Sequence, residues 1–287
     1  MRHNDRVLQR FDDADAFLAA AGDFLVAREA EHNLILGICS SLRDDPGTYG
    51  SAPYFAVVTT AGRVIGAAIQ TPPFRLILSE IDDDQAIEAL AADLVERDLP
   101  GVFGPVDVVR AFVEARTRRG GSPGRLDLSE RIYRLTTVRP PRPTVGGWRV
   151  ANQEDRPTVA RWLEAFMREA FGDADPVETS TMTDRWLAQR ERTLYLWEHD
   201  ESVSLCGVGG PTPNGIRIGP VYTPPELRGR GYASALVAAV SQAALGAGRK
   251  YCFLFTDLAN DTSNHIYQAI GYEPVGDVDI YVFERDG

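Results

Sequence analysis

Apolar residues in the second half of the chain recur at two different spacings. Val159, Trp162, Leu163 and Phe166 are three or four residues apart, which predicts a helix over about 157–170. Other stretches are short apolar runs bounded by Gly, Pro or Asp, which is typical of strands. We expect further helices at about 183–190, 229–245 and 262–270, and strands at 148–150, 194–197, 203–208, 216–222, 251–256 and 279–283.

The first half of the chain shows the same succession of patterns. It predicts helices at about 13–21, 23–39, 84–97 and 106–116, and strands at 54–59, 64–70, 75–78, 101–103 and 132–138. Local sequence agrees with a repeat, because RVIGAAIQTPPFRLIL resembles SVSLCGVGGPTPNGIRIGP in its pattern. Strands joined by a mixture of connections indicate an α/β or α+β sheet in each half.

A proline-rich segment separates the two halves. The run VRPPRPTVGGW, residues 138–148, holds extended backbone at its prolines and loosens at its glycines. Each side is long enough for a domain. We therefore expect a domain at 1–138, a linker at 139–147 and a second domain at 148–287.

Composition narrows the classes of function. The 287 residues carry a net charge of −11, which argues against a nucleic-acid partner. The charge is better explained by solubility than by a cationic substrate. We find no apolar run of membrane-spanning length and no signal-peptide core, so a cytoplasmic location without membrane association is expected. Cys39, Cys206 and Cys252 lie in apolar contexts without metal-ligand spacing, which predicts buried, reduced thiols and no metal.

The run ELRGRGYASAL, residues 226–236, carries the strongest chemical signal. It follows an expected strand and opens an expected helix. Gly229 and Gly231 let the backbone approach a ligand, and the first N–H groups of a helix attract an anion. Arg228 and Arg230 add charge that can reach phosphate. The run is thus either a pyrophosphate cradle or a simple turn.

A second pattern follows about thirty residues later, with the spacing N-x-x-S-x-x-x-Y-x-x-x-G-Y. It comprises Asn260, Ser263, Tyr267 and the pair Gly271 and Tyr272. The first three recur at helical intervals and can share one helix face. With the glycine-arginine run, this segment resembles the GNAT superfamily of acyl-CoA-dependent N-acyltransferases. The LFTDLAND run is similar to the FR47-like branch of that superfamily.

The resemblance implies a fold and a reaction. The fold would be two tandem GNAT-like domains, each a mixed, mostly antiparallel sheet flanked by helices. The reaction would be direct transfer of an acetyl group from acetyl-CoA to a primary amine, on a small molecule or a peptide N-terminus. Tyr267 would be the general acid toward the CoA thiolate. The CoA-binding residues would be Val221, Tyr222, Thr223, Arg228, Gly229, Arg230, Gly231, Tyr232, Ala233, Ser234, Asn260 and Ser263. Gly219 and Pro220 suit the disrupted strand beside which the family holds pantetheine.

The N-terminal half lacks both motifs. Where a cradle would stand, it has Asp82, Asp83 and Asp84, which repel a phosphate and suit a helix N-terminus as caps. We therefore expect a degenerate copy that does not bind CoA.

The general base and the acceptor site are open. Many relatives place a glutamate on the strand that here reads Ile216, Arg217 and Ile218. Candidates by position are Glu169, Glu198, His199, Asp257 and Asp279, with a water-relayed or substrate-carried proton as alternatives. Large apolar residues for an acceptor pocket are Phe166, Met167, Phe171 and Trp186, and residues 167–176 could form a lid. Two further interpretations are a non-catalytic acyl-CoA sensor and a tandem-domain thiol-biosynthetic acetyltransferase. The oligomeric state is not predicted.

Overall fold

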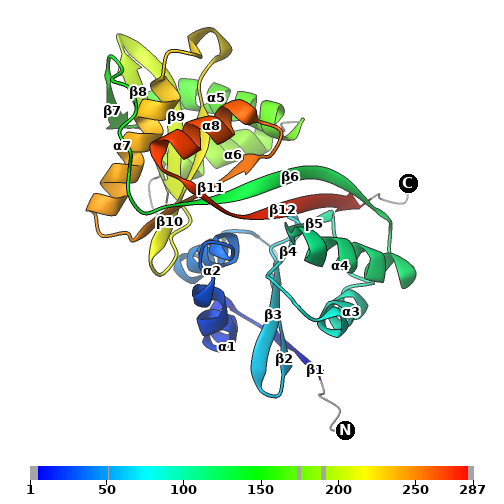
Figure 1. Ribbon diagram of the computed structural model, residues 1–287. Helices are drawn as coiled ribbons and strands as arrows, with labels where there is room; N and C mark the ends of the chain where they lie inside the picture. Colours follow the sequence, from blue (N-terminus) through cyan, green and yellow to red (C-terminus); the bar gives the residue numbers. More distant parts are fainter. Residues whose placement is uncertain (1–5, 51, 173–175, 189–191, 284–287) are drawn as a thin grey trace. The chain divides into compact units, whose positions relative to one another are not determined.

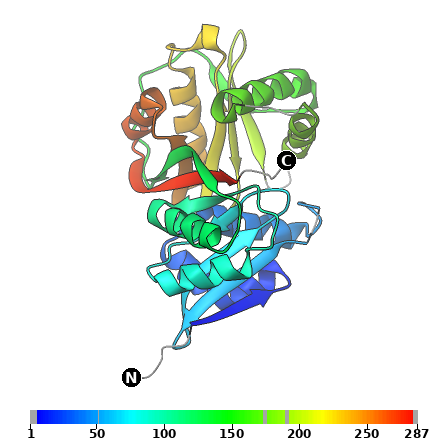
Figure 2. The ribbon, with the colours of Figure 1, turned by 90° about the vertical axis from the view of Figure 1, so that its right-hand side faces the viewer.

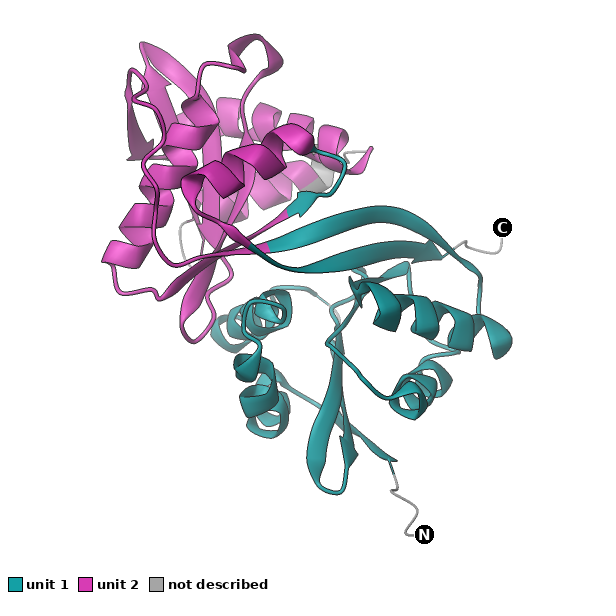
Figure 3. Ribbon diagram, in the orientation of Figure 1, with its two compact units in different colours: residues 1–132, 256–260, 274–287 teal, residues 133–255, 261–273 magenta. Residues whose placement is uncertain are grey.

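The computed structural model describes residues 6–50, 52–172, 176–188 and 192–283. They form two compact units, each built from separate stretches of chain (Figure 3). Unit 1 comprises residues 1–132, 256–260 and 274–287, and unit 2 comprises residues 133–255 and 261–273. The expected linker, 139–147, lies inside unit 2, so the compact units are not the same segments as the expected domains.

Unit 1 is a sheet with helices on both faces. Its elements are β1 (Arg6–Phe11), α1 (Ala14–Ala27), α2 (Asn33–Asp44), β2 (Tyr54–Thr60), β3 (Arg63–Gln70), β4 (Leu76–Leu78), α3 (Asp84–Asp93), β5 (Gly101–Pro105), α4 (Val106–Arg118) and β6 (Gly124–Leu135). The strand β12 (Glu273–Phe283) completes it, and the strand order is β1-β2-β3-β4-β5-β12-β6. Helices α1 and α2 lie on one face, and α3 and α4 lie on the other (Figure 1).

Unit 2 repeats this design. Its elements are β7 (Gly147–Val150), α5 (Arg156–Phe171), α6 (Pro176–Leu187), β8 (Thr193–His199), β9 (Glu201–Gly209), β10 (Gly215–Tyr222), α7 (Tyr232–Gly246), β11 (Tyr251–Asp257) and α8 (Asp261–Ile270). The strand order is β7-β8-β9-β10-β11, with the end of β6 beside β11. Figure 2 shows α5 and α6, in green, on one face and α7 and α8, in gold and brown, on the other.

The predicted internal repeat is confirmed by the order of elements. Each half runs strand, two helices, three strands, helix, strand, helix, strand. The two similar sequence stretches occupy equivalent antiparallel pairs, β3 with β4 and β9 with β10. The pairs β4 with β5 and β10 with β11 are parallel, so each sheet is mixed.

Three local expectations were wrong. No strand was predicted at β1, because three of its six residues have charged or amide side chains and none is fully buried, so the apolar pattern is weak. The break between the first two helices falls at residues 28–32 rather than at Gly22. Gly22 lies inside α1, where a glycine costs only about 1 kcal/mol relative to alanine. The last strand begins at Glu273 and pairs with β5 in unit 1, with Ile280 opposite Phe103.

Caps and burial explain why these segments adopt their elements. The predicted capping role of the aspartates before α3 is confirmed at Asp83, whose carboxylate accepts from the amides of Gln85 and Ala86 at 3.0 and 3.1 Å. In unit 2 the apolar faces of α7 and α8 bury Leu236 and Tyr267 against β9, β10 and β11. Within the described residues, no helix is long and apolar enough to cross a membrane.

Candidate functional site

The strands β10 and β11 run together only at their beginnings. Their parallel ladder joins Gly215 to Tyr251, Ile216 to Cys252 and Arg217 to Phe253, and the described residues show no further pair. Both strands continue, to Tyr222 and to Asp257. The edge of β10 that faces β11 is therefore unpaired over its second half, which leaves backbone groups available to a ligand.

A bulge in β10 accompanies this separation. The register between β9 and β10 shifts between Ile218 and Val221, so the disruption predicted at Gly219 and Pro220 is present. Gly207 on β9 permits the close approach, since a Cβ there would lie 2.6 Å from the Gly219 carbonyl oxygen and 2.7 Å from the Trp186 ring. Trp186, expected in the acceptor pocket, thus packs beside the bulge.

The loop from Arg228 to Gly231 leads into α7, whose N-terminus has no side-chain cap. Gly229 and Gly231 have φ values of 75° and 83°, which favour glycine. Gly231 is the N-cap of α7, no side chain caps this end, and the first turn holds no acidic residue. Gly229, Arg230 and Gly231 are exposed, while Ala233 and Ser234 are half-buried. The free amides and the helix dipole make this end suitable for an anion.

The Arg228 side chain is engaged by residues outside α7. Its Nε donates to the Thr223 carbonyl oxygen at 2.8 Å, and its Nη2 donates to Glu169 on α5 at 2.7 Å. The guanidinium also lies 5.7 Å from the centre of the Tyr222 ring. Arg230 reaches back to the Glu226 carbonyl oxygen at 3.3 Å. Arg228 therefore joins the loop to α5, and a phosphate would have to compete for its guanidinium.

Two further predicted residues hold the loop to the sheet. The Thr223 hydroxyl lies 2.8 Å from the Ser204 hydroxyl on β9. The Tyr232 hydroxyl lies 2.7 Å from Nδ1 of His199 at the end of β8, and the Tyr232 side chain is buried. The side chains of Thr223 and Tyr232 therefore fix the backbone on either side of the loop.

Tyr267 lies in the core of unit 2 on α8. Its ring packs edge-on against Tyr272 at 6.0 Å, and burial raises the pKa of its hydroxyl, with Cys206 adding to the effect. The described residues offer this hydroxyl no hydrogen-bond partner, whereas the Tyr272 hydroxyl is bonded to Ser241 at 2.8 Å. A protonated phenol without a fixed partner can donate to a nearby anion.

The N-terminus of α8 is placed by its flanking loop. Asn260 is exposed, and its backbone N–H donates to the Asp257 carbonyl oxygen at 3.0 Å. Ser263 is half-buried. The predicted turn at Gly271 and Tyr272 is confirmed, since Gly271 has a φ of 112° and the Tyr272 amide donates to the Tyr267 carbonyl oxygen at 3.0 Å.

The expected acceptor aromatics divide between core and surface. Trp186 is buried, whereas Phe171 is 43% exposed and packs edge-on against Phe166. Part of the expected lid, residues 173–175, lies outside the described residues.

The carboxylates considered as general base are engaged. In unit 2, Glu169 pairs with Arg228, and Glu198 accepts from Arg149 Nε at 2.8 Å. In unit 1, Asp279 is buried and accepts from the Ser129 hydroxyl at 2.6 Å. Unit 1 also holds Glu130, which the sequence did not single out. Burial, together with Asp257, raises the pKa of Glu130 to about 7.

Two structural features of unit 2 were missed from the sequence. The buried Tyr133 hydroxyl donates to Asn264 at 3.0 Å and accepts from Gln268 at 2.9 Å, which fixes α8 and thereby Tyr267. The only sequence signal was the four-residue spacing of the two amides on α8. The second feature is Thr144, whose hydroxyl lies 2.9 Å from the position of a Cβ on Gly231.

Residues 156–272 match the sequence model of the family described as the Acetyltransferase (GNAT) family. The match includes the loop before α7 and Tyr267 on α8. This match agrees with the resemblance that the two motifs indicated. No curated protein sequence matches the chain.

Several solved structures resemble the whole chain. A tandem GNAT protein from the clavulanic acid biosynthesis pathway is 16% identical with a TM-score of 0.59, over 96% of this chain and 98% of that one. A GNAT-family acetyltransferase from Colwellia psychrerythraea is 10% identical with a TM-score of 0.56, over 97% and 100%. A Drosophila protein is 14% identical with a TM-score of 0.67, over 97% and 99%. These likenesses confirm the predicted fold class, two tandem GNAT-like domains.

Proposed function

We propose that this protein transfers an acetyl group from acetyl-CoA to a primary amine, by direct attack in a ternary complex. The observation that carries the proposal is the uncapped N-terminus of α7, which follows a strand, β10, that separates from β11 after Arg217. The helix end offers an anion site, and the strand beside it has an unpaired edge. A long, phosphate-bearing thioester requires both.

The residues at the helix end suit the phosphates of CoA. The amides from Arg228 to Ala233 would hold the pyrophosphate, and the Ser234 hydroxyl would add a donor. The left-handed glycines allow this backbone to lie close to the ligand. Because the first turn of α7 has no acidic residue, no carboxylate of that turn repels the ligand.

The reacting end would lie along β10. A backbone N–H of Val221 or Tyr222 would polarise the thioester carbonyl, as oxyanion donors do. Asn260 and Ser263 would bind the pantetheine amides. Tyr267 would protonate the leaving thiolate, because a phenol carries its proton at neutral pH.

A second candidate function is acyl-CoA binding without catalysis. It is favoured by β10, which has Ile216, Arg217 and Ile218 where many relatives carry a glutamate. The engagement of Glu169 with Arg228 and of Glu198 with Arg149 also favours it. A transferase would then rely on a water or on the substrate to remove the proton.

Calorimetric titration with acetyl-CoA and with CoA tests the proposal. The informative variant is Ala233→Glu, because an acidic residue in the first turn stabilises a helix while it repels phosphate. Ala243→Glu, exposed on the same helix, is the matched control. We expect saturable binding to the wild type and to Ala243→Glu, and loss of binding in Ala233→Glu. Absence of binding to the wild type would contradict both candidate functions.

A screen of amines for CoA release then separates the two candidates. Turnover with any small amine or peptide N-terminus supports the transferase. Binding without turnover across the screen supports the binding module. The cytoplasmic location expected from the sequence stays a prediction.

A further inference from the structure

The segment 139–147 contacts the rest of unit 2 at three places. The Arg139 amide donates to the Ile270 carbonyl oxygen at the end of α8, at 2.7 Å. The Val145 carbonyl oxygen accepts from the Trp197 ring nitrogen on β8, at 3.0 Å. Between these points, Thr144 approaches Gly231 at the start of α7. Figure 1 shows this green trace running from the end of β6 along α7 to β7.

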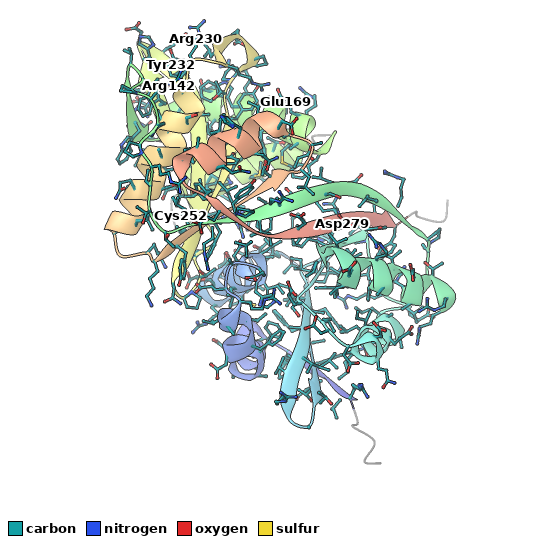
Figure 4. The ribbon with its side chains drawn as sticks, in the orientation of Figure 1. Arg142, Glu169, Arg230, Tyr232, Cys252 and Asp279 are labelled. Carbon is teal, nitrogen blue, oxygen red and sulfur yellow. The ribbon has the colours of Figure 1, made fainter. Side chains whose placement is uncertain are left out.

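Arg142 lies on this segment, two residues from the contact with Gly231. Its side chain is exposed, and its backbone carbonyl accepts from the Thr144 hydroxyl at 3.3 Å. Figure 4 labels Arg142 with Arg230 and Tyr232, the residues on either side of Gly231. Within the described residues the Arg142 guanidinium makes no ion pair or hydrogen bond, in contrast to Arg228, which is held by Glu169.

A cation at this position changes the electrostatics of the helix end. The chain carries a net charge of −11, which opposes the approach of a polyanion such as CoA. Arg228 is engaged with Glu169, so its charge is largely offset. Arg142 and Arg230 are the exposed cations near Gly231 that the described residues leave without a carboxylate partner.

We propose that segment 139–147 forms one wall of the CoA phosphate site and that Arg142 pairs with a phosphate group of CoA. This rests on the proposed function, since it concerns the same ligand. An arginine suits the role, because its planar guanidinium presents two parallel donors to phosphate oxygens. The contact of Thr144 with Gly231 would keep the segment, and therefore Arg142, at a constant distance from the amides of α7.

The test compares two arginines of one segment. Arg142→Gln and Arg139→Gln remove the same charge. Arg139, however, is the first residue of the segment, and its side chain packs beside Gly271 rather than near Gly231. We expect Arg142→Gln to weaken CoA binding about tenfold, as loss of one charged hydrogen bond does, and Arg139→Gln to leave it unchanged. Arg142→Lys should keep most of the affinity, and the affinity lost in Arg142→Gln should shrink at high salt.

A titration with 3′-dephospho-CoA identifies which phosphate is paired. If Arg142→Gln weakens only CoA, the partner is the 3′-phosphate; if it weakens both ligands equally, the partner is the pyrophosphate. Equal affinities for Arg142→Gln, Arg139→Gln and the wild type would overturn the inference and leave the proposed function intact. A wild type that binds neither ligand would overturn both.

Discussion

The Nη2 atom of Arg228 lies 2.7 Å from the carboxylate of Glu169, and this ion pair connects the loop before α7 with α5. Both side chains are 47% exposed. The pair bears on two predictions made from the sequence, because it engages an arginine expected on phosphate and a glutamate considered as general base.

We predict that Glu169 is not the general base. Glu169→Gln should lower turnover less than about threefold, whereas loss of a general base typically costs 100-fold or more. The free energy of unfolding should fall by at most about 1 kcal/mol, since exposed ion pairs contribute little. Glu164→Gln, which breaks the pair with Arg168 on the same helix, is the control. A drop in kcat of two orders of magnitude, seen only in Glu169→Gln, would restore Glu169 to the mechanism.

Tyr267→Phe should separate chemistry from binding. Removal of the proton donor should lower kcat by about 100-fold or more and leave the acetyl-CoA affinity unchanged. Stability should hardly change, because the described residues offer the lost hydroxyl no hydrogen bond. The control is Tyr272→Phe, which loses the bond to Ser241 and about 1 kcal/mol of stability but should keep kcat. Unchanged turnover in Tyr267→Phe would remove this residue from the reaction.

The two left-handed glycines of the loop should differ in their tolerance of alanine. Both substitutions cost about 1 kcal/mol for the positive φ. Gly231→Ala should cost more, because its Cβ would meet the Thr144 hydroxyl at 2.9 Å, while a Cβ on Gly229 would meet no heavy atom within 4 Å. Denaturant unfolding measures the difference. Thr144→Ala should recover part of the stability lost in Gly231→Ala; no recovery would mean that Thr144 does not restrict this position.

Gly207→Ala should disturb the bulge of β10. The new Cβ would lie 2.6 Å from the Gly219 carbonyl oxygen and 2.9 Å from Pro220, and backbone cannot retreat as a side chain can. We expect a loss of about 1–3 kcal/mol, typical of overpacking, with weaker acetyl-CoA binding. Gly209→Ala on the same strand meets the flexible Arg192 side chain and should cost less. Equal losses for both variants would argue against a special role for Gly207.

Glu130 should make the stability of the protein depend on pH. Its pKa rises from 4.5 to about 7 on folding, so its stabilising contribution is complete below about pH 4.5 and is lost as the pH rises through 7. Glu130→Gln should therefore have a higher free energy of unfolding than the wild type at pH 8, by at most about 3 kcal/mol, and about the same free energy of unfolding at pH 4.5. Glu114→Gln on α4 is the control. An identical pH profile in Glu130→Gln would contradict the raised pKa.

Local sequence was sufficient for most elements and for the two motifs of unit 2. Apolar spacing predicts α5, because Val159, Trp162 and Leu163 must share a buried face whatever they pack against. The glycine-arginine run and the spacing of Asn260, Ser263 and Tyr267 are also properties of adjacent residues. They place a strand, a loop and a helix without reference to distant parts of the chain.

Contacts between distant residues were decided only by the tertiary structure. The sequence by itself determined most of the repeated order of elements, β1 excepted, and the motif that opens α7. The pairing of β12 with β5, the engagement of Arg228 by Glu169 and the approach of Thr144 to Gly231 join residues 59 or more positions apart. Hydrogen bonds and packing between such distant residues depend on which surfaces come together when the chain folds. The spacing of side chains along the sequence does not specify those contacts.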